Sequence, residues 1–242
     1  MIQQELQKLT MVPVPSVTNT YSPIDNMVIH DTIVNEAKSN GFEITDMFVK
    51  TKNGRNCITM YSLQDKLASY QDPEIGIRVA FKNSYDRTMS FGFALGSEVF
   101  ICSNGMVSGE YTIKKQHRMR EVEEYAKELI CQYFGNVRGE HEKNLVFASK
   151  LKTHSVSRED AARIVGELFI NNKIINQSQL REMTNQMFTS EKFGNFSNND
   201  FISGWDLYNH GTEALKSSAN ANSFTKHIGY SNYFRGFFGI GD

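Results

Sequence analysis

Hydrophobic residues recur with two different periods along this chain, and the changes of period divide it into sheet-forming and helix-forming parts. Residues 22–40 have helical spacing, with Ser22 and Pro23 suited to the first positions of a helix and Asn40-Gly41 suited to its end. From residue 43 to residue 115, β-favouring runs alternate with turn sequences. The helical period of 3.6 residues returns after that and predicts a long helix over 118–134.

The period-two runs predict an antiparallel sheet. Asn53-Gly54, the strongest short hairpin signal, joins the first two runs. We expect strands over residues 43–52, 55–64, 75–82, 89–96, 98–102 and 110–115, with turns at 72–73, 83–86 and 103–105. Strand 89–96 has one bulky face, and its other face carries only Ser90, Gly92, Ala94 and Gly96. That bare face favours close packing of a helix or, alternatively, the approach of a ligand to the backbone.

The rest of the chain is predicted to be helical, so the fold class is α+β: an antiparallel β-meander sheet packed by a long helix, with a helical C-terminal part. The helix over 118–134 covers the bulky face of the sheet, and the charged residues 136–155 predict a connection. Further helices are expected over 158–171, 178–189 and 203–216, the first capped by Ser157 with Asp160. The predicted divisions are an N-terminal arm (1–20), an α+β sheet domain (21–135), a helical part (136–216), and a flexible linker with an aromatic tail (217–242).

Composition narrows the class of protein. The chain has 242 residues, 40% of them hydrophobic, and a net charge of −1, which excludes a strongly basic histone-like protein and a polyanionic disordered chain. Three widely spaced cysteines argue against a disulfide framework and favour a reducing compartment. No export signal or apolar run of about 20 residues is present. We therefore expect an intracellular protein with no membrane partner.

Common catalytic signatures are absent from the sequence. It contains no phosphate-binding loop, no dinucleotide-binding motif, no nucleophile elbow and no Cys-x-x-Cys, so no cofactor or metal is expected. Cys102 could be a nucleophile or, more simply, a small buried residue, and His117 could be a base, a phosphate contact or a solvated histidine. A metal-dependent nuclease would need converging carboxylates beside a strand lysine, and the acidic candidates lie in turns: Asp65, Asp72, Glu74 and Asp86.

The basic residues point to nucleic acid. Lys114, Lys115, Arg118 and Arg120 lie within seven positions at a strand-to-helix junction, with no acidic residue among them. Arg78 and Lys82 project from one face of a strand, and Arg87 lies in the adjoining turn. Such residues could follow a phosphate backbone, with nearby aromatic rings stacking on bases. Ordinary solvated charges are the alternative.

The chain ends with an aromatic tail that follows a Ser/Asn/Ala-rich linker. Its rings are Phe224, Tyr230, Tyr233, Phe234, Phe237 and Phe238. The tail could complete the core, or it could pack on a neighbouring subunit, since exposed apolar patches of this size usually form interfaces. The second interpretation predicts a homo-oligomer.

Three segments together resemble the phage/plasmid-like domain of unknown function of family nine-three-two. They are the turn and strand from Asn83-Ser84-Tyr85-Asp86 through Phe91–Gly96, the segment Val99–Met106, and Trp205-Asp206-Leu207-Tyr208-Asn209 with Thr212-Glu213. His210-Gly211 departs from the family pattern, and glycine there costs about 1 kcal/mol against alanine, so a bent or shorter helix is expected. The resemblance implies a mobile element and a bacterial host cytoplasm, and it implies no catalytic residues.

These observations leave three hypotheses for function. The first is a non-enzymatic nucleic-acid-binding protein of a phage or mobile element, binding or annealing single-stranded DNA in replication or recombination. Its predicted architecture is similar to that of phage single-strand annealing proteins, although a shared fold is weak support for a shared function. The second is a protein–protein module that inhibits a host defence system, and the third is a metal-dependent nuclease.

Overall fold

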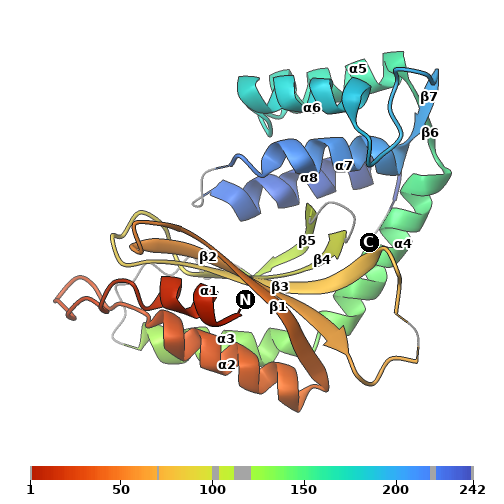
Figure 1. The fold of residues 1–242 in the computed structure, drawn as a ribbon. Coiled ribbons are helices and arrows are strands. Elements are labelled where there is room, and N and C mark those ends of the chain that lie inside the picture. Colours follow the sequence, from red (N-terminus) through yellow and green to blue (C-terminus); the bar gives the residue numbers. More distant parts are fainter. Residues whose placement is uncertain (1, 70, 100–103, 112–120, 219–221, 241–242) are drawn as a thin grey trace.

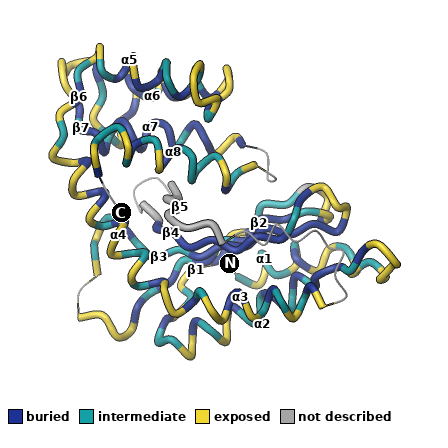
Figure 2. Tube along the Cα trace, turned by 180° about the vertical axis from the view of Figure 1, so that it is seen from behind, coloured by how far each residue is buried: buried dark blue, intermediate teal, exposed yellow. Residues whose placement is uncertain are grey.

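A computed structural model of the chain describes residues 2–69, 71–99, 104–111, 121–218 and 222–240 (Figure 1). It confirms the α+β class and the antiparallel meander. The sheet has five strands in the order β1-β2-β3-β4-β5, with bounds Phe42–Lys52, Asn56–Asp65, Ile75–Ser84, Gly92–Val99 and Asn104–Tyr111. Helices lie on both faces of this sheet, and its central strand β3 is mostly buried, as Figure 2 shows by its dark colour.

The hairpin between β1 and β2 forms as predicted. Asn53 and Gly54 have φ values of +53° and +68°, and Lys52 pairs with Asn56, so the hairpin loop consists of residues 53–55. Helix α2 (Asn26–Ser39) ends beside Gly41 as expected but begins four residues after Ser22. The Asp25 carboxylate caps it by accepting the Met27 N–H at 2.8 Å, which corrects the predicted start at Ser22-Pro23.

The later strands differ from the prediction. The expected strands 89–96 and 98–102 are not separate where they are described, because Ser97 continues the β4 ladder opposite Ile77, and residues 100–102 lie outside the described residues. Asn104 and Gly105 begin β5 and do not form a turn, so β5 starts before the expected strand 110–115, of which residues 112–115 lie outside the described residues. Asn83 and Ser84 extend β3, so the turn comes later and includes Arg87 at φ +63°. Cys102 and His117 lie outside the described residues.

One face of the sheet packs on three helices: α1 (Ile2–Leu9), α2 and α3 (Val122–Phe134). The α3 packing confirms the prediction that a long helix covers the bulky face, with the rings of Phe93 and Phe134 stacked at 6.4 Å. The N-terminal segment is not a detached arm, because Leu9 is only 2% exposed within this core. Glu5 also accepts the Val49 N–H at 2.6 Å, which satisfies part of the edge strand β1.

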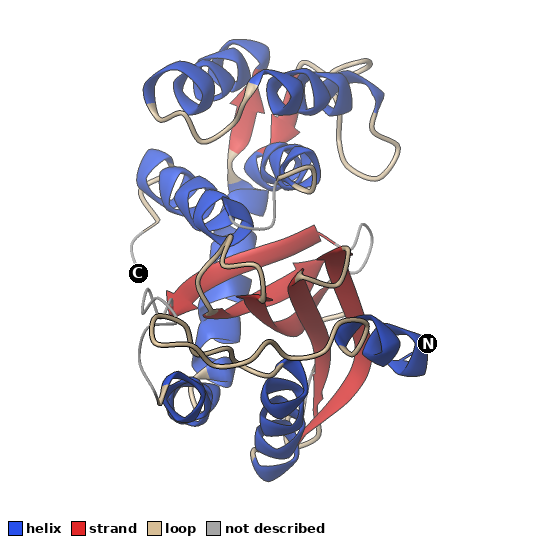
Figure 3. Cartoon of the chain, turned by 90° about the vertical axis from the view of Figure 1, so that its left-hand side faces the viewer, coloured by secondary structure: helices blue, strands red, loops and turns tan. Residues whose placement is uncertain are grey.

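The charged segment 136–155 is a helix, which corrects the predicted connection. Helix α4 (Val137–Thr153) follows α3 after two residues and links the sheet to the helical part of the molecule (Figures 1 and 3). Its buried residues are Val137, Asn144, Phe147, Ala148 and Leu151. They form a narrow stripe in a helix that is otherwise charged, so the hydrophobic signal in the sequence is weak.

The helical part has its own core. It comprises α5 (Arg158–Gly166), a π-helical continuation (Glu167–Asn171), α6 (Gln177–Thr189) and α7 (Gly204–Leu215), with a ribbon of two short strands, β6 (Ser155–Ser157) and β7 (Phe201–Ser203). Ser157 caps α5 as predicted, its Oγ accepting the Asp160 N–H at 3.1 Å. Helix α7 continues through Gly211, where an added Cβ would lie 2.0 Å from the Tyr230 hydroxyl. The glycine therefore allows close packing, and the helix does not end at this position.

The aromatic tail is helix α8 (Ser223–Phe237), which packs between α7 and the second face of the sheet. Phe224 joins Ile58, Ala80 and Ala94 in a small cluster, so a helix does cover the bare face of β4. Tyr230 and Phe234 are fully buried against Tyr208. Phe224, Tyr230 and Phe234 thus belong to the chain's own core, which corrects their expected role in a subunit interface.

Tyr233, Phe237 and Phe238 are half-buried, and for them self-association stays a prediction. No helix among the described residues is long and apolar enough to cross a membrane.

Candidate functional sites

The meander brings three segments to one end of the sheet, which we call the basic sheet end and define by Arg55, Arg87 and the last residue of β5, Tyr111. Asn56 pairs with Ser84 across β2 and β3, so the turns after β1 and after β3 lie at the same end. Tyr85 N–H donates to the Arg55 carbonyl at 2.6 Å and joins these turns. Tyr111 pairs with Phe93, which pairs with Phe81, so β5 also ends there.

Arg55 and Arg87 are both exposed. The Arg87 guanidinium lies 4.5 Å from the centre of the Tyr21 ring, a cation–π contact that orients it at the surface. Burial raises the pKa of Tyr21, whose hydroxyl donates to the Ser84 carbonyl at 3.2 Å. Tyr21 is itself 4% exposed, so it supports the arginine and is not open for base stacking.

The structure does not bring Arg78 and Lys82 to this exposed surface. Both lie on the second face of the sheet, where Lys82 is 4% exposed and its Nζ lies 5.1 Å from the centre of the Phe224 ring. Arg78 is half-buried, with its guanidinium 4.0 Å from the sulfur of Met60. Lys114, Lys115, Arg118 and Arg120 lie outside the described residues.

Of the predicted nucleic-acid residues, only Arg87 is therefore described at the exposed basic end. Sequence reasoning missed its neighbour Arg55. A signal existed, because Arg55 directly follows Asn53-Gly54 and so had to lie at the tip of a hairpin.

The Asn83-Ser84-Tyr85-Asp86 segment has a structural role beside this end. The Asn83 amide donates to the Ile24 carbonyl at 2.7 Å and to Asn26 Oδ1 at 2.8 Å, and the Tyr85 hydroxyl accepts the Asn26 N–H at 3.1 Å. These bonds fix the start of α2 on β3. Cys57 lies in the same buried cluster, and burial raises the pKa of its thiol to about 12, so it is not a nucleophile.

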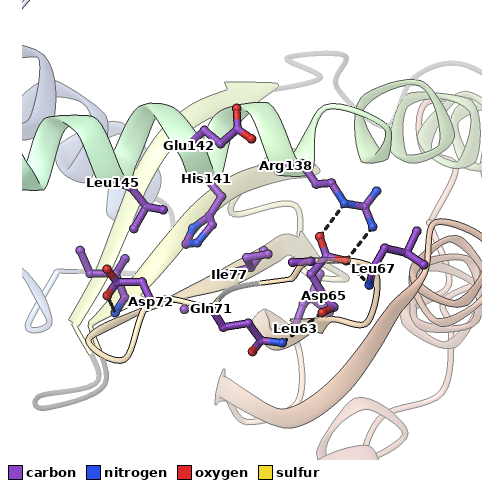
Figure 4. Close-up of a pocket in the computed structure, with 13 residues that line it drawn as sticks. Leu63, Asp65, Leu67, Gln71, Asp72, Ile77, Arg138, His141, Glu142 and Leu145 are labelled. Carbon is purple, nitrogen blue, oxygen red and sulfur yellow. Dashed lines mark hydrogen bonds and ion pairs between the residues drawn. The ribbon is translucent and has the colours of Figure 1, made fainter.

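A separate cavity of about 320 Å³ lies between α4 and the connection from β2 to β3 (Figure 4). Its residues combine an apolar floor with a charged rim: Leu63, Asp65, Leu67, Ala68, Gln71, Asp72, Ile75, Gly76, Ile77, Arg138, His141, Glu142 and Leu145. Arg138 binds Asp65 through two hydrogen bonds of 2.5 and 2.8 Å and also donates to the Asn40 carbonyl at 2.7 Å. These hydrogen bonds hold the pKa of Asp65 below its ordinary value.

His141 projects from α4 into this cavity (Figure 4). Its Nδ1 lies 2.9 Å from Ser97 Oγ, which also accepts a hydrogen bond of 2.9 Å from the buried Asn144 amide. Burial lowers the pKa of His141, while the fields of Asp72, Glu142 and Asp65 act in the opposite direction. Burial therefore favours the neutral imidazole, and the Ser97 contact at Nδ1 fixes the orientation of the ring.

Of the four carboxylates considered for a nuclease, Asp65 and Asp72 line the same cavity, and Glu74 and Asp86 lie apart from it. Asp65 is paired with Arg138, Glu74 pairs with Lys152 at 2.5 Å, and Asp86 binds Thr88 at the opposite end of the sheet. Across the described parts of the chain, no three His, Cys, Asp or Glu side chains are grouped so that they could hold a metal ion.

Comparison with known proteins gives one result. The model of a family described as "Domain of unknown function (DUF932)" matches residues 13–230, which is most of the chain. Searches of curated proteins and of solved structures found no significant match. On the extent of the family match, the chain belongs to the DUF932 family.

Proposed function

We propose that this chain is a non-enzymatic nucleic-acid-binding protein of a phage or other mobile element, which binds single-stranded DNA in the host cytoplasm during replication or recombination. The observation that carries the proposal is the basic sheet end. The turns that carry exposed Arg55 and Arg87 lie side by side there, at the end where β5 stops, and the basic run containing Lys114, Lys115, Arg118 and Arg120 follows β5 in sequence.

Electrostatics explains why such an end suits a phosphate backbone. Cations on separate turns of a rigid sheet can contact several phosphates without first being ordered, and each contact releases counterions. No acidic side chain pairs with Arg55 or Arg87 in a described ion pair. Because Tyr21 is buried beneath Arg87, binding would depend on phosphates more than on base stacking and would tolerate different sequences.

Fluorescence anisotropy with a labelled oligothymidylate tests the proposal. The double variant R55Q/R87Q and the quadruple variant K114Q/K115Q/R118Q/R120Q should each weaken binding. For every phosphate that a variant no longer neutralises, the slope of log K against log salt should also become shallower by about 0.7 for a single strand.

The matched control is R181Q/K192Q, which removes two exposed cations from the helical part. It should bind as the unaltered chain does. Unchanged binding in folded R55Q/R87Q and quadruple variants would refute a site at the basic sheet end, and absence of binding by the unaltered chain would refute the function.

The two alternative functions gain no support from the fold. A host-protein inhibitor would use the aromatic tail as its contact surface, and three of the six tail rings lie in the core. A metal-dependent nuclease needs carboxylates that meet, and Asp65, Asp72, Glu74 and Asp86 are held by separate partners.

A further inference from the structure

The cavity between α4 and the β2–β3 connection has no part in the proposed DNA contact, because it lies at the other end of the sheet from Arg55 and Arg87. We propose that it binds a small organic cation, with an ammonium or guanidinium head on a short apolar stem. Three features carry this assignment: the charge of the rim, the apolar floor and the positioned imidazole of His141.

The rim is net negative. Asp65, Asp72 and Glu142 contribute three carboxylates, and Arg138 contributes one cation. The Arg138 guanidinium is already committed to Asp65 and to the Asn40 carbonyl, and it lies 4.4 Å from the centre of the Phe42 ring. An anionic ligand would therefore find no available cation and would meet carboxylates instead.

One carboxylate of the rim can take a new hydrogen-bond donor. Asp72 uses Oδ1 to accept the N–H groups of Glu74 and Ile75 at 2.8 and 2.9 Å, which fixes its position and leaves Oδ2. Glu142 is exposed, and its carboxylate points away from the cavity (Figure 4), so it adds negative charge at the rim without contacting the ligand. A bound ammonium group would donate to Asp72 Oδ2, and hydrogen bonds of this kind are about twice as strong as neutral ones.

The floor and the imidazole complete the site. Leu63, Ile77 and Leu145 offer an apolar surface to the stem of the ligand. The Ser97 contact at Nδ1 leaves Nε2 of His141 available, and a bound cationic head would favour the tautomer in which Nε2 carries the lone pair. A cavity of about 320 Å³ is at the lower end of the range for small-molecule sites.

Nuclear magnetic resonance titration of the full chain with n-butylammonium, n-butylguanidinium and the neutral 1-butanol tests the assignment. At least one cation should cause saturable shifts at Ala68, Gly76 and Glu142. The binding of 1-butanol should be at least about tenfold weaker, which corresponds to the loss of one charged hydrogen bond. Equal binding of alcohol and cations, or no saturable binding of either cation, would overturn the proposal.

Two variants locate the site. D72N should weaken the binding of n-butylammonium by about threefold to tenfold, since it removes the charge of the carboxylate that contacts the ligand. A68W should fill the mouth of the cavity and abolish binding, whereas S69W, one residue further along the same exposed loop, should leave it unchanged. Retained binding in folded A68W would place the cation elsewhere and refute the site.

The pH dependence gives a further check. Asp65 from β2, Asp72 from the loop and Arg138 from its own helix line the cavity with His141, its ring contacts Ser97 of β4, and Glu142 is the next residue of the helix. Burial lowers the His141 pKa from its usual value of about 6.5, so binding should be constant between about pH 7 and 8. As pH falls through this lowered pKa, a protonated imidazole would repel the ligand and weaken binding. Tighter binding at low pH would contradict the assignment.

Discussion

Helices cover both faces of the sheet, but the side chains that pack beneath them differ in size and polarity. Towards α2 and α3, large apolar side chains such as Tyr61, Phe81 and Phe93 form one continuous core. Towards α8, small residues and cations share the surface, and among the described side chains the buried apolar cluster consists of Ile58, Ala80, Ala94 and Phe224. A polar-looking sheet face is therefore not necessarily a solvent-facing one, because a helix from the far end of the chain can cover it.

The largest expected effect comes from removing the helix that covers the second face. A chain that ends at Ser218 should be insoluble or lack a cooperative unfolding transition. Tyr208 would no longer pack on the rings of Tyr230 and Phe234, both at 5.2 Å, and the second sheet face would be exposed. Solubility and thermal unfolding followed by circular dichroism would measure this. A soluble, folded, truncated chain would show instead that α8 is a detachable arm.

Single aromatic substitutions should separate the two faces. Phe93→Ala removes a fully buried ring from the large core and should cost about 3–5 kcal/mol of unfolding free energy. Phe224→Ala should cost less than Phe93→Ala, because its cluster is small. Phe201→Ala is the control, since that ring is 60% exposed, and it should change stability by no more than about 0.5 kcal/mol. Equal costs for Phe93 and Phe224 would mean that the two faces contribute alike.

The same contrast explains which features the sequence could predict. The first face follows a strict alternation with large apolar residues, and its helix α3 has strong periodicity, so both were found. Helix α4 was missed because its stripe of buried residues is narrow and lies among charged residues. The covering role of α8 was missed because an aromatic helix can pack in its own core or at a subunit interface, and only the tertiary contacts distinguish the two.

The candidate sites depended even more on long-range geometry. Arg87 was identified from its turn, whereas the pairing of Arg55 with it depends on the strand register. The cavity joins residues from β2, β3 and α4 that are up to 82 positions apart, from Leu63 to Leu145, and no local pattern marks such a site.

An intermediate effect on the free energy of unfolding is expected for the Asp65–Arg138 ion pair beside the cavity. Asp65→Asn should cost about 1–3 kcal/mol, because it leaves the Arg138 guanidinium without its carboxylate. The folded-state pKa of Asp65 is depressed, so its stabilisation is present above the unfolded value near 3.9 and is lost as pH falls through the folded pKa. Urea unfolding from pH 7 to pH 2 should show a shallower acid loss in the variant. An identical acid profile would mean that Asp65 does not contribute to it.

The smallest effect is expected at Lys82, where the sequence suggested a phosphate contact. An added Cβ on Gly92 would lie 2.9 Å from Lys82 Cε, so the lysine stem fills the space that the glycine leaves, while its Nζ lies over the Phe224 ring. Lys82→Met keeps an apolar stem and removes only the charge, so stability should change by about 1 kcal/mol or less.

Affinity for oligothymidylate should not change in Lys82→Met, because a side chain that is 4% exposed beneath α8 cannot reach a phosphate. Lys82→Glu is the matched variant that tests the ring contact, and it should be clearly less stable, since a carboxylate is repelled by the face of the ring. The comparison with R55Q/R87Q decides between the two surfaces. If Lys82→Met weakens DNA binding as much as that double variant does, α8 must leave the sheet when DNA binds, and the second face becomes the binding surface.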